Sequence, residues 1–430
     1  MISRRSVTGA ATVGAAMLLA GGAGGAGVAG AVDGRGNAVR PRLPKPTGPH
    51  AIGVTTLYLV DRARRDPLDP YPVREVMASV FYPARATHGA ETAPTAPAVA
   101  TAPAAPTAPY MTQGAAASFV QIDVHLHGLP AEGVDWAGIA THAHPNAPAE
   151  TGARRPVLLY SPGGGDPRGL GTGLAEELAA HGYIVVTVDH PGDGSEVEFP
   201  VTTAYRDEKV RETVFRGDPR ADGALFQTVI ETRIADLRFV LDALAELASG
   251  RNPDAAGRPV PEHLAQVLDL RRVGVYGHSA GGTAAAGTLY EDRRVHAAVN
   301  LEGYLDHTPR TPGELGELFP VARHGTDRPL LLVESEGFDG KQEDREALLR
   351  SWKVMLAHPH GNTRRRRVDD AMHWIFTDYA AFAPQLQAEG LMSADARDSL
   401  VGPVAPATSV PVVRRHVHGF FARHLPVRTR

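Results

Sequence analysis

Short apolar runs rich in β-branched residues recur along the chain and predict the strands of a sheet. The runs occupy residues 73–82, 157–160, 184–188, 273–276, 297–301 and 330–333. Apolar runs of this length, bounded by turn residues, are typical of strands inside a covered sheet. We therefore expect these segments to form the centre of the fold.

Helical patterns lie between the strand-like runs. One apolar face is formed by Ile230, Ile234, Leu237, Leu241 and Leu244, which follow one another at helical spacing. Residues 174–180 fit a second helix, and residues 413–421 fit a C-terminal helix that packs on the sheet rather than anchoring in lipid. Alternating strands and helices predict an α/β fold with a mostly parallel sheet and helices on both faces.

The first 31 residues have the features of an export signal. Arg4 and Arg5 precede a weakly apolar run at 13–19, and small residues at 29–31 offer a cleavage site. The run is shorter than the ~20 residues that a membrane-spanning helix needs. We expect a twin-arginine-type signal, a secreted mature protein and no stable insertion into a membrane.

Two segments are too biased in composition to form a packed core. Residues 32–47, rich in Pro, Gly and Arg, are predicted to be a linker. Residues 93–109 contain only Ala, Pro, Thr and one Val, and we interpret them as a surface insertion without chemistry. The remaining chain, residues 48–427, is predicted to form one domain.

Charge and cysteine content exclude several classes of function. The chain has 44 Lys and Arg against 48 Asp and Glu, a formal net charge of −4, so nothing indicates a nucleic-acid partner. It has no cysteine, which excludes disulfides, thiolate metal sites and a cysteine nucleophile. We expect a monomer.

The segment at residues 273–286 carries the clearest chemical motif. A β-branched strand runs into Gly277-His278-Ser279-Ala280-Gly281, and small residues continue into a helix. This Gly-x-Ser-x-Gly setting forces a sharp turn that projects the Ser279 hydroxyl above the sheet edge. Because a serine hydroxyl is a poor nucleophile by itself, a histidine base and an acidic residue must follow later in the chain.

His373, after the last strand-like segment, is the leading candidate for the base, and position alone also admits His358, His360 and His416. The acid must come from a loop after a later strand. Glu302 follows the run at 297–301 directly, whereas Glu334, Glu336 and Asp339 follow the next run. Spacing alone leaves both loops open.

A tetrahedral oxyanion needs two N–H donors, each contributing ~3 kcal/mol in the transition state. Ala280, next to the nucleophile, offers one. The glycine loop that ends the run at 157–160 offers the second at Gly164. This loop lacks the Lys-Ser/Thr pair and the glycine spacing of nucleotide sites, so we expect no nucleotide to bind there.

Paired histidines raise the alternative of a metal site. His125 and His127 form one pair, His142 and His144 a second, and Asp123 could complete a ligand set. No His-Glu-x-x-His helix exists, and both pairs lie in Gly/Pro-rich segments. We interpret them as incidental loop histidines and expect no metal.

Several motifs together resemble the platelet-activating factor acetylhydrolase family of α/β-hydrolases, plasma or isoform II type. They are the Ser-Pro-Gly-Gly-Gly loop at 161–165, residues 178–190, residues 277–282, residues 329–336 and the His-x-x-Phe-Thr-Asp element at 373–378. The resemblance runs from about residue 50 to 425 and implies the α/β-hydrolase fold without metal or cofactor. It also implies Glu302 as the acid, Gly164 as an oxyanion donor and no catalytic role for Glu336.

The resemblance implies hydrolysis of short or oxidised acyl chains from phospholipids, hence a small-molecule or lipid ester as substrate. Two departures stand against full transfer: Glu302 replaces the family's usual Asp, and residues 93–109 and 121–148 fall where relatives shape substrate access. The alternatives are a lipase or cutinase-like polyester hydrolase, and a secreted lipid-binding homologue without catalysis.

Overall fold

The computed structural model describes residues 38–85, 106–218, 220–311, 313–337, 342–359 and 361–428. All of these belong to one compact unit, Ala38–Arg430. The predicted export signal, the first part of the predicted linker and residues 93–105 of the predicted insertion lie outside the described residues.

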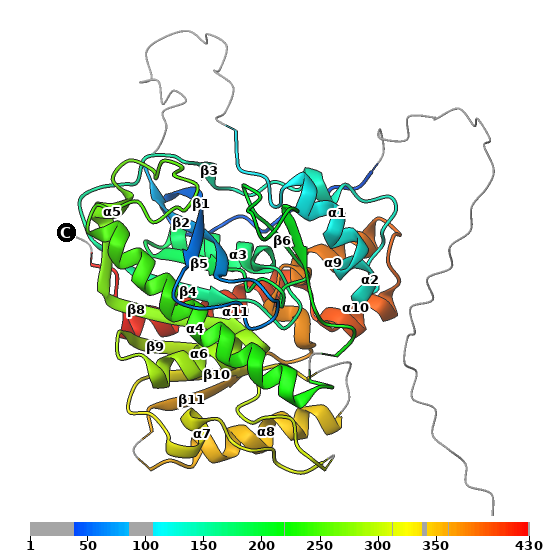
Figure 1. Cartoon of the computed structure of the whole chain (residues 1–430). Helices are drawn as coiled ribbons and strands as arrows, with labels where there is room; N and C mark the ends of the chain where they lie inside the picture. The colour runs from blue at the N-terminus through cyan, green and yellow to red at the C-terminus, as the bar shows by residue number, and fades with distance from the viewer. Residues whose placement is uncertain are drawn as a thin grey trace, which may run out of the picture. The chain divides into compact units, whose positions relative to one another are not determined.

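A nine-stranded sheet forms the centre of the described residues, in the order β11-β10-β9-β8-β4-β5-β2-β1-β3 (Figure 1). The strands are β1 (Ala51–Asp61), β2 (Arg74–Ala84), β3 (His144–Pro145), β4 (Arg155–Ser161), β5 (Ile184–Val188), β8 (Leu268–His278), β9 (Val295–Leu301), β10 (Leu330–Glu334) and β11 (Thr363–Arg367). Strands β4, β5 and β8 to β11 run parallel, whereas β2 pairs antiparallel with both β1 and β5. The predicted mostly parallel sheet is confirmed.

Helices cover both faces of the sheet. The longer helices are α1 (Gln113–Gln121), α3 (Thr172–Ala180), α4 (Gly223–Ala248), α6 (Ala280–Glu291), α8 (Gln342–Leu356), α9 (Tyr379–Ala388), α10 (Ala394–Val401) and α11 (Pro406–His424). Shorter ones are α2 (Asp123–Leu126), α5 (Leu264–Val267), α7 (Pro320–His324), η2 (Trp136–Gly138), η3 (Arg168–Gly171) and η4 (His373–Phe376), and β6 (Glu196–Glu198) pairs with β7 (Val210–Glu212). One apolar core lies under α3, α9 and α11, and a second lies under α4, α6 and α8.

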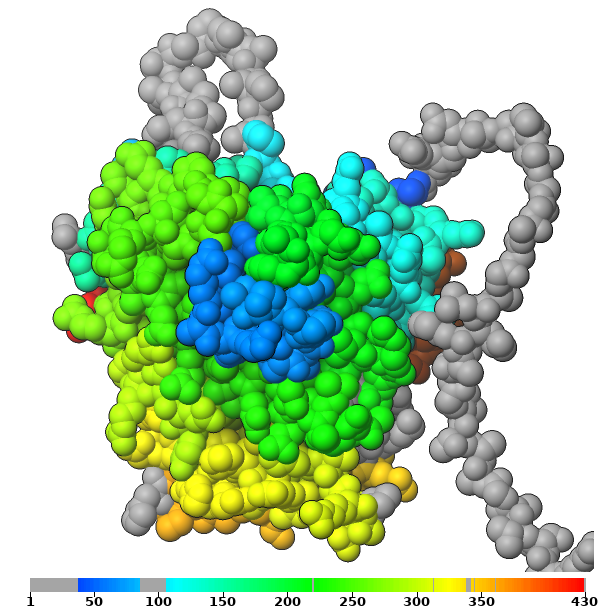
Figure 2. All heavy atoms as spheres, viewed as in Figure 1, coloured from blue at the N-terminus to red at the C-terminus, as the bar shows by residue number. Residues whose placement is uncertain are grey.

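Buried ion pairs join the β1–β2 connection to the segment after β5. Arg74 is fully buried and donates to Asp66 and Asp236, each at 2.8 Å, while Arg211 also donates to Asp66 at 2.6 Å. Figure 2 shows this connection, in blue, lying against the green segment that follows β5. These charges tie the start of the domain to α4.

The described end of the predicted linker differs from the prediction, because residues 38–47 pack on the domain. Leu43 is buried in the first core, and Arg414 of α11 donates to the Lys45 carbonyl at 2.9 Å. The end of the predicted insertion is likewise ordered, with Pro109 bridging to Ala140. Composition hides such contacts because isolated apolar residues and backbone carbonyls suffice to make them.

Within the described residues, no helix has both the length and the apolar character needed to cross a membrane.

Candidate active site

Ser279 lies on the turn between β8 and α6. Its backbone has φ 53° and ψ −122°, a strained conformation for a residue with a side chain. The turn is held because the Ser279 N–H donates to the Leu301 carbonyl at 2.8 Å. The predicted strand-turn-helix setting of the motif is therefore present.

The glycines of the motif are required by close backbone approach. A Cβ at Gly277 would lie 2.2 Å from the Gly281 carbonyl oxygen, and a Cβ at Gly281 would lie 2.0 Å from the Ser161 carbonyl oxygen. Side chains at these positions would push the turn away from the β4 loop. The motif thus brings Ser279 next to the glycine loop.

That loop follows β4 and carries Gly164. Gly163, Gly164, Ser279 and Ala280 line one pocket of about 610 Å³. Within the described residues, neither the Gly164 N–H nor the Ala280 N–H donates a hydrogen bond to another protein group. Two N–H groups at the pocket wall are therefore available to an oxygen atom in the pocket.

Glu302 and His373 meet although 71 residues separate them. His373 Nδ1 lies 2.8 Å from Glu302 Oε2, and both side chains are buried. The Ser335 N–H donates to Glu302 Oε1 at 2.5 Å, and the Ser335 hydroxyl donates to both oxygens at 2.7 and 2.8 Å. The carboxylate is thus fixed by Ser335 on one side and contacts the imidazole on the other.

Burial shifts the protonation of both groups. It raises the pKa of the Glu302 carboxyl to about 7, although the two Ser335 donors act in the opposite direction. Burial also holds the pKa of the His373 imidazole well below its usual value. His373 is therefore neutral at neutral pH and can accept a proton.

The competing candidates have other partners. Glu334 pairs with Arg345 at 3.2 Å and with Arg365, and Glu336 pairs with Arg367. The His358 ring contacts the Ala322 carbonyl at 2.8 Å, and His416 lies half-buried on α11. Asp339 and His360 lie outside the described residues. Among the described candidates, the structure brings Glu302 and His373 together.

The pocket also has apolar and charged walls. Trp374, Tyr304 and Leu400 contribute apolar surface, and Arg220 and Asp218 contribute charge. The Arg220 guanidinium carbon lies 3.8 Å from the centre of the Tyr304 ring. The site can therefore take a substrate with a sizeable apolar part and a polar end.

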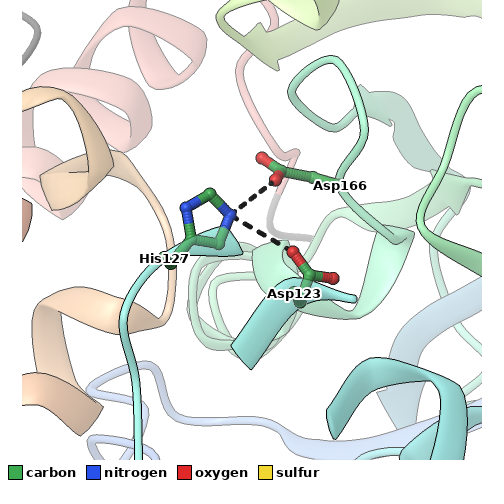
Figure 3. Close-up of side chains that lie close together, drawn as sticks. All are labelled: Asp123, His127 and Asp166. Carbon is green, nitrogen blue, oxygen red and sulfur yellow. Dashed lines mark ion pairs between the residues drawn. The ribbon is translucent and has the colours of Figure 1, made fainter. Parts of the chain in front are cut away.

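A buried ionic cluster forms another part of this wall (Figure 3). His127 Nε2 lies 3.2 Å from Asp123 Oδ1 and 3.6 Å from Asp166 Oδ1. Asp166 Oδ2 in turn lies 3.6 Å from the Nδ1 atom of His278, whose Nε2 contacts the His373 carbonyl at 3.1 Å. The cluster connects the glycine loop to α2, to the nucleophile turn and to the His373 segment.

Asp123, His127 and Asp166 are the one group of possible metal ligands among the described residues, with ligand atoms within 4.8 Å of one another. Burial alone would lower the pKa of His127, but the two carboxylates more than offset it and raise the pKa to about 9. A protonated imidazole thus supplies the positive charge that the carboxylates need. His125 does not join the cluster, because α2 is helical rather than extended, and His142 pairs with Glu176 at 2.8 Å instead.

Comparison with known proteins places these features in a family. The family model for platelet-activating factor acetylhydrolase, isoform II, matches residues 38–407. The chain belongs to this family. It is 25% identical over 391 residues to the probable 1-alkyl-2-acetylglycerophosphocholine esterase of Arthroderma benhamiae, covering 88% of this chain and 87% of that protein. It is 26% identical over 272 residues to the Bos taurus platelet-activating factor acetylhydrolase, covering 57% and 53%.

A solved structure agrees with the family. The ferulic acid esterase from Streptomyces cinnamoneus superposes with a TM-score of 0.64 at 30% identity, covering 91% of this chain and 94% of that one. The fold is therefore that of the α/β-hydrolases, and the protein is a carboxylic ester hydrolase.

Sequence reasoning missed the residues that support the site. Ser335, Asp166 and Arg233 contact the loops or the acid directly. Only Arg233 carried a local signal: it is a fully buried charge within the apolar face of α4. A charge in such a position indicates a specific buried partner.

Proposed function

We propose that this protein is an exported serine esterase in which Ser279 is the nucleophile, His373 the general base and Glu302 the acid. One observation carries the proposal: the Glu302–His373 contact of 2.8 Å lies at the pocket that Ser279 enters from a strained turn. A base oriented by an acid, in one pocket with a serine on a strained turn, is the arrangement that acyl transfer requires.

The reaction proceeds in two halves. Ser279 Oγ attacks the ester carbonyl carbon while His373 takes the hydroxyl proton, and the carbonyl electron pair moves onto oxygen. The Gly164 and Ala280 N–H groups hold that oxygen. Collapse breaks the bond to the alcohol, which leaves with the proton from His373. Water then attacks the acyl-enzyme through the same steps and releases the carboxylic acid product.

Glu302 acts through His373. Its carboxylate accepts the Nδ1 proton, which leaves the other ring nitrogen free to receive the proton of Ser279. The extra methylene relative to Asp is accommodated because Ser335 fixes the carboxylate with three contacts of 2.5 to 2.8 Å.

The substrate class we propose is a short-acyl lipid ester. Support comes from the family match, from the relatives named for acetyl-ester hydrolysis and from a pocket of about 610 Å³ with apolar and charged walls. An aromatic ester is the second candidate, favoured by Trp374 and Tyr304 in the pocket and by the ferulic acid esterase neighbour. Residues 1–31 are proposed to direct export, and the mature enzyme is proposed to be a monomer.

A fluorophosphonate probe tests the nucleophile. We expect it to label the wild-type protein and the Ser399→Ala variant, but not Ser279→Ala. Ser399 is a matched control because it lines the same pocket without lying on the strained turn. Labelling of Ser279→Ala at the wild-type level would reject the assignment, and absence of labelling in all three would favour a non-catalytic lipid-binding protein.

Substrate class is tested by comparing kcat/KM for nitrophenyl esters of increasing acyl length, a short-acyl phospholipid and methyl ferulate. We expect the highest values for short acyl chains and for the phospholipid. A clear preference for methyl ferulate would select the aromatic-ester alternative.

A further inference from the structure

A fully buried arginine, Arg233, lies against the loop that carries the proposed oxyanion donor. It projects from α4, and its Nε pairs with Asp193. Its Nη2 donates to the Gly163 carbonyl at 2.7 Å, and its Nη1 donates to the Pro162 carbonyl and to Ser161 Oγ. One planar guanidinium thus contacts three consecutive residues of the loop.

The shorter of the two hydrogen bonds to the Gly163 carbonyl comes from Arg233, and it constrains where the Gly164 N–H points. The longer one comes from the Asp166 N–H at 3.2 Å. The carbonyl of Gly163 and the N–H of Gly164 belong to the same planar peptide unit, and no described peptide bond is cis. In a trans peptide these two groups point in opposite directions. Because Arg233 holds the carbonyl on its own side, the N–H is directed away from Arg233, and Gly164 lines the pocket.

The next peptide is fixed by the counter-ion. Asp193 Oδ1 accepts the Gly165 N–H at 3.0 Å, while its Oδ2 pairs with Arg233. The two peptide units on either side of the Gly164 α-carbon are therefore both held by one buried ion pair. The three glycines have no side chains that could restrict these peptides.

A buried ion pair is weak evidence for a role in stability, because desolvation offsets most of the attraction between its charges. The geometry of this pair instead fixes the loop, since every nitrogen of the guanidinium contacts either Asp193 or residues 161–163. Donation to the Gly163 carbonyl also polarises that peptide and makes the Gly164 N–H a stronger donor.

We propose that Arg233, held by Asp193, is a positioning residue that orients the Gly164 N–H toward the oxyanion. This proposal rests on the proposed serine esterase function. Arg233 does not touch the substrate; it acts through the Gly163–Gly164 peptide.

The Arg233→Lys variant tests the proposal. Lysine keeps the charge opposite Asp193, but its single ammonium group cannot reach the carbonyls of residues 162 and 163 together. Loss of an oxyanion donor reduces kcat by about 100 to 1,000-fold, and we expect misorientation to cost roughly 10 to 100-fold in kcat with little change in KM. The affinity for a boronic acid transition-state analogue should fall by a similar factor.

Arg206→Lys is the matched control. Arg206 is also buried and paired with a carboxylate, Glu75. Its other hydrogen bonds go to the carbonyls of Glu208 and Val201, and its guanidinium lies over the Phe199 ring, all outside the glycine loop. We expect this variant to lose thermal stability to a similar extent and to keep the wild-type kcat and analogue affinity, with rates normalised to titrated Ser279.

Wild-type kcat and analogue affinity in Arg233→Lys would overturn the proposal. If that variant does not fold, Asp193→Asn provides the second test, and an unchanged kcat there would equally overturn it. These outcomes differ from failure of the esterase assignment, which would appear as undiminished activity in Ser279→Ala.

Discussion

Replacement of Glu302 by glutamine should separate catalysis from stability. Glu302 Oε1 accepts both the N–H and the hydroxyl of Ser335, so the amide oxygen of glutamine should take that place. The amide NH₂ group then faces His373 Nδ1 in place of Oε2. A donor at that position obliges Nδ1 to accept, which moves the ring proton to Nε2, the atom that must receive the Ser279 proton.

The expected loss of activity is therefore large. A wrong imidazole tautomer in such a triad costs about 10,000-fold in kcat. The substitution does not alter the pocket wall, because Glu302 is fully buried behind His373 and is not among the residues that line the pocket. KM should accordingly change little.

The free energy of unfolding should change far less than the activity does. Burial raises the pKa of Glu302 from 4.5 to about 7, so the folded state binds this proton more tightly than the unfolded state does. Above pH 7, holding the charged form in the fold therefore costs roughly 3 kcal/mol, which glutamine avoids. An imperfectly paired amide costs about 1 to 3 kcal/mol. We expect the free energy of unfolding at pH 8 to fall by no more than about 1 kcal/mol.

The assay combines kcat for nitrophenyl acetate, normalised by active-site titration, with urea unfolding at pH 8. Glu336→Gln is the matched control, since Glu336 follows β10 but pairs with Arg367 at the surface. We expect it to retain activity within about 2-fold. A Glu302→Gln variant with more than a tenth of wild-type kcat, or an inactive Glu336→Gln variant, would refute the acid assignment.

Two further predictions concern buried histidines. His190 contacts Asp236 at 3.0 Å, and burial lowers the pKa of its imidazole to about 4. The unfolded chain binds this proton near pH 6.5. The free energy of unfolding should therefore fall by roughly 3 kcal/mol between pH 6.5 and 4. Urea unfolding across that pH range should show that the free energy of unfolding depends less steeply on pH in His190→Gln than in the wild type. An identical pH dependence in the two proteins would contradict this prediction. Exhaustive chelation should leave kcat unchanged, because protonated His127 already balances the charges of Asp123 and Asp166. If chelation lowers kcat, a divalent cation restores it and elemental analysis finds stoichiometric metal, these three residues are metal ligands instead.

The local patterns of the chain were sufficient for most of the sheet and for the nucleophile turn. Strands β4, β5, β8, β9 and β10 contain the predicted apolar runs, because burial on both faces demands such runs wherever the strands pair. The motif around Ser279 could be recognised in the sequence because Gly277 and Gly281, where close backbone contacts exclude a side chain, are part of one short turn. Strand β1 and the packed segment 38–47 were missed, since their contacts rest on partners elsewhere in the chain.

By itself, the sequence determined an α/β chain with a serine on a strained turn, a short set of possible bases and two possible acid loops. Only the tertiary structure joined Glu302 to His373 across 71 residues and placed Arg233, 70 residues beyond Gly163, against the glycine loop. The physical reason is the distance along the chain over which each kind of interaction acts. Strand and turn preferences arise from neighbouring residues, whereas buried charges are tolerated only where the folded chain brings them a partner, and no local pattern specifies which partner that is.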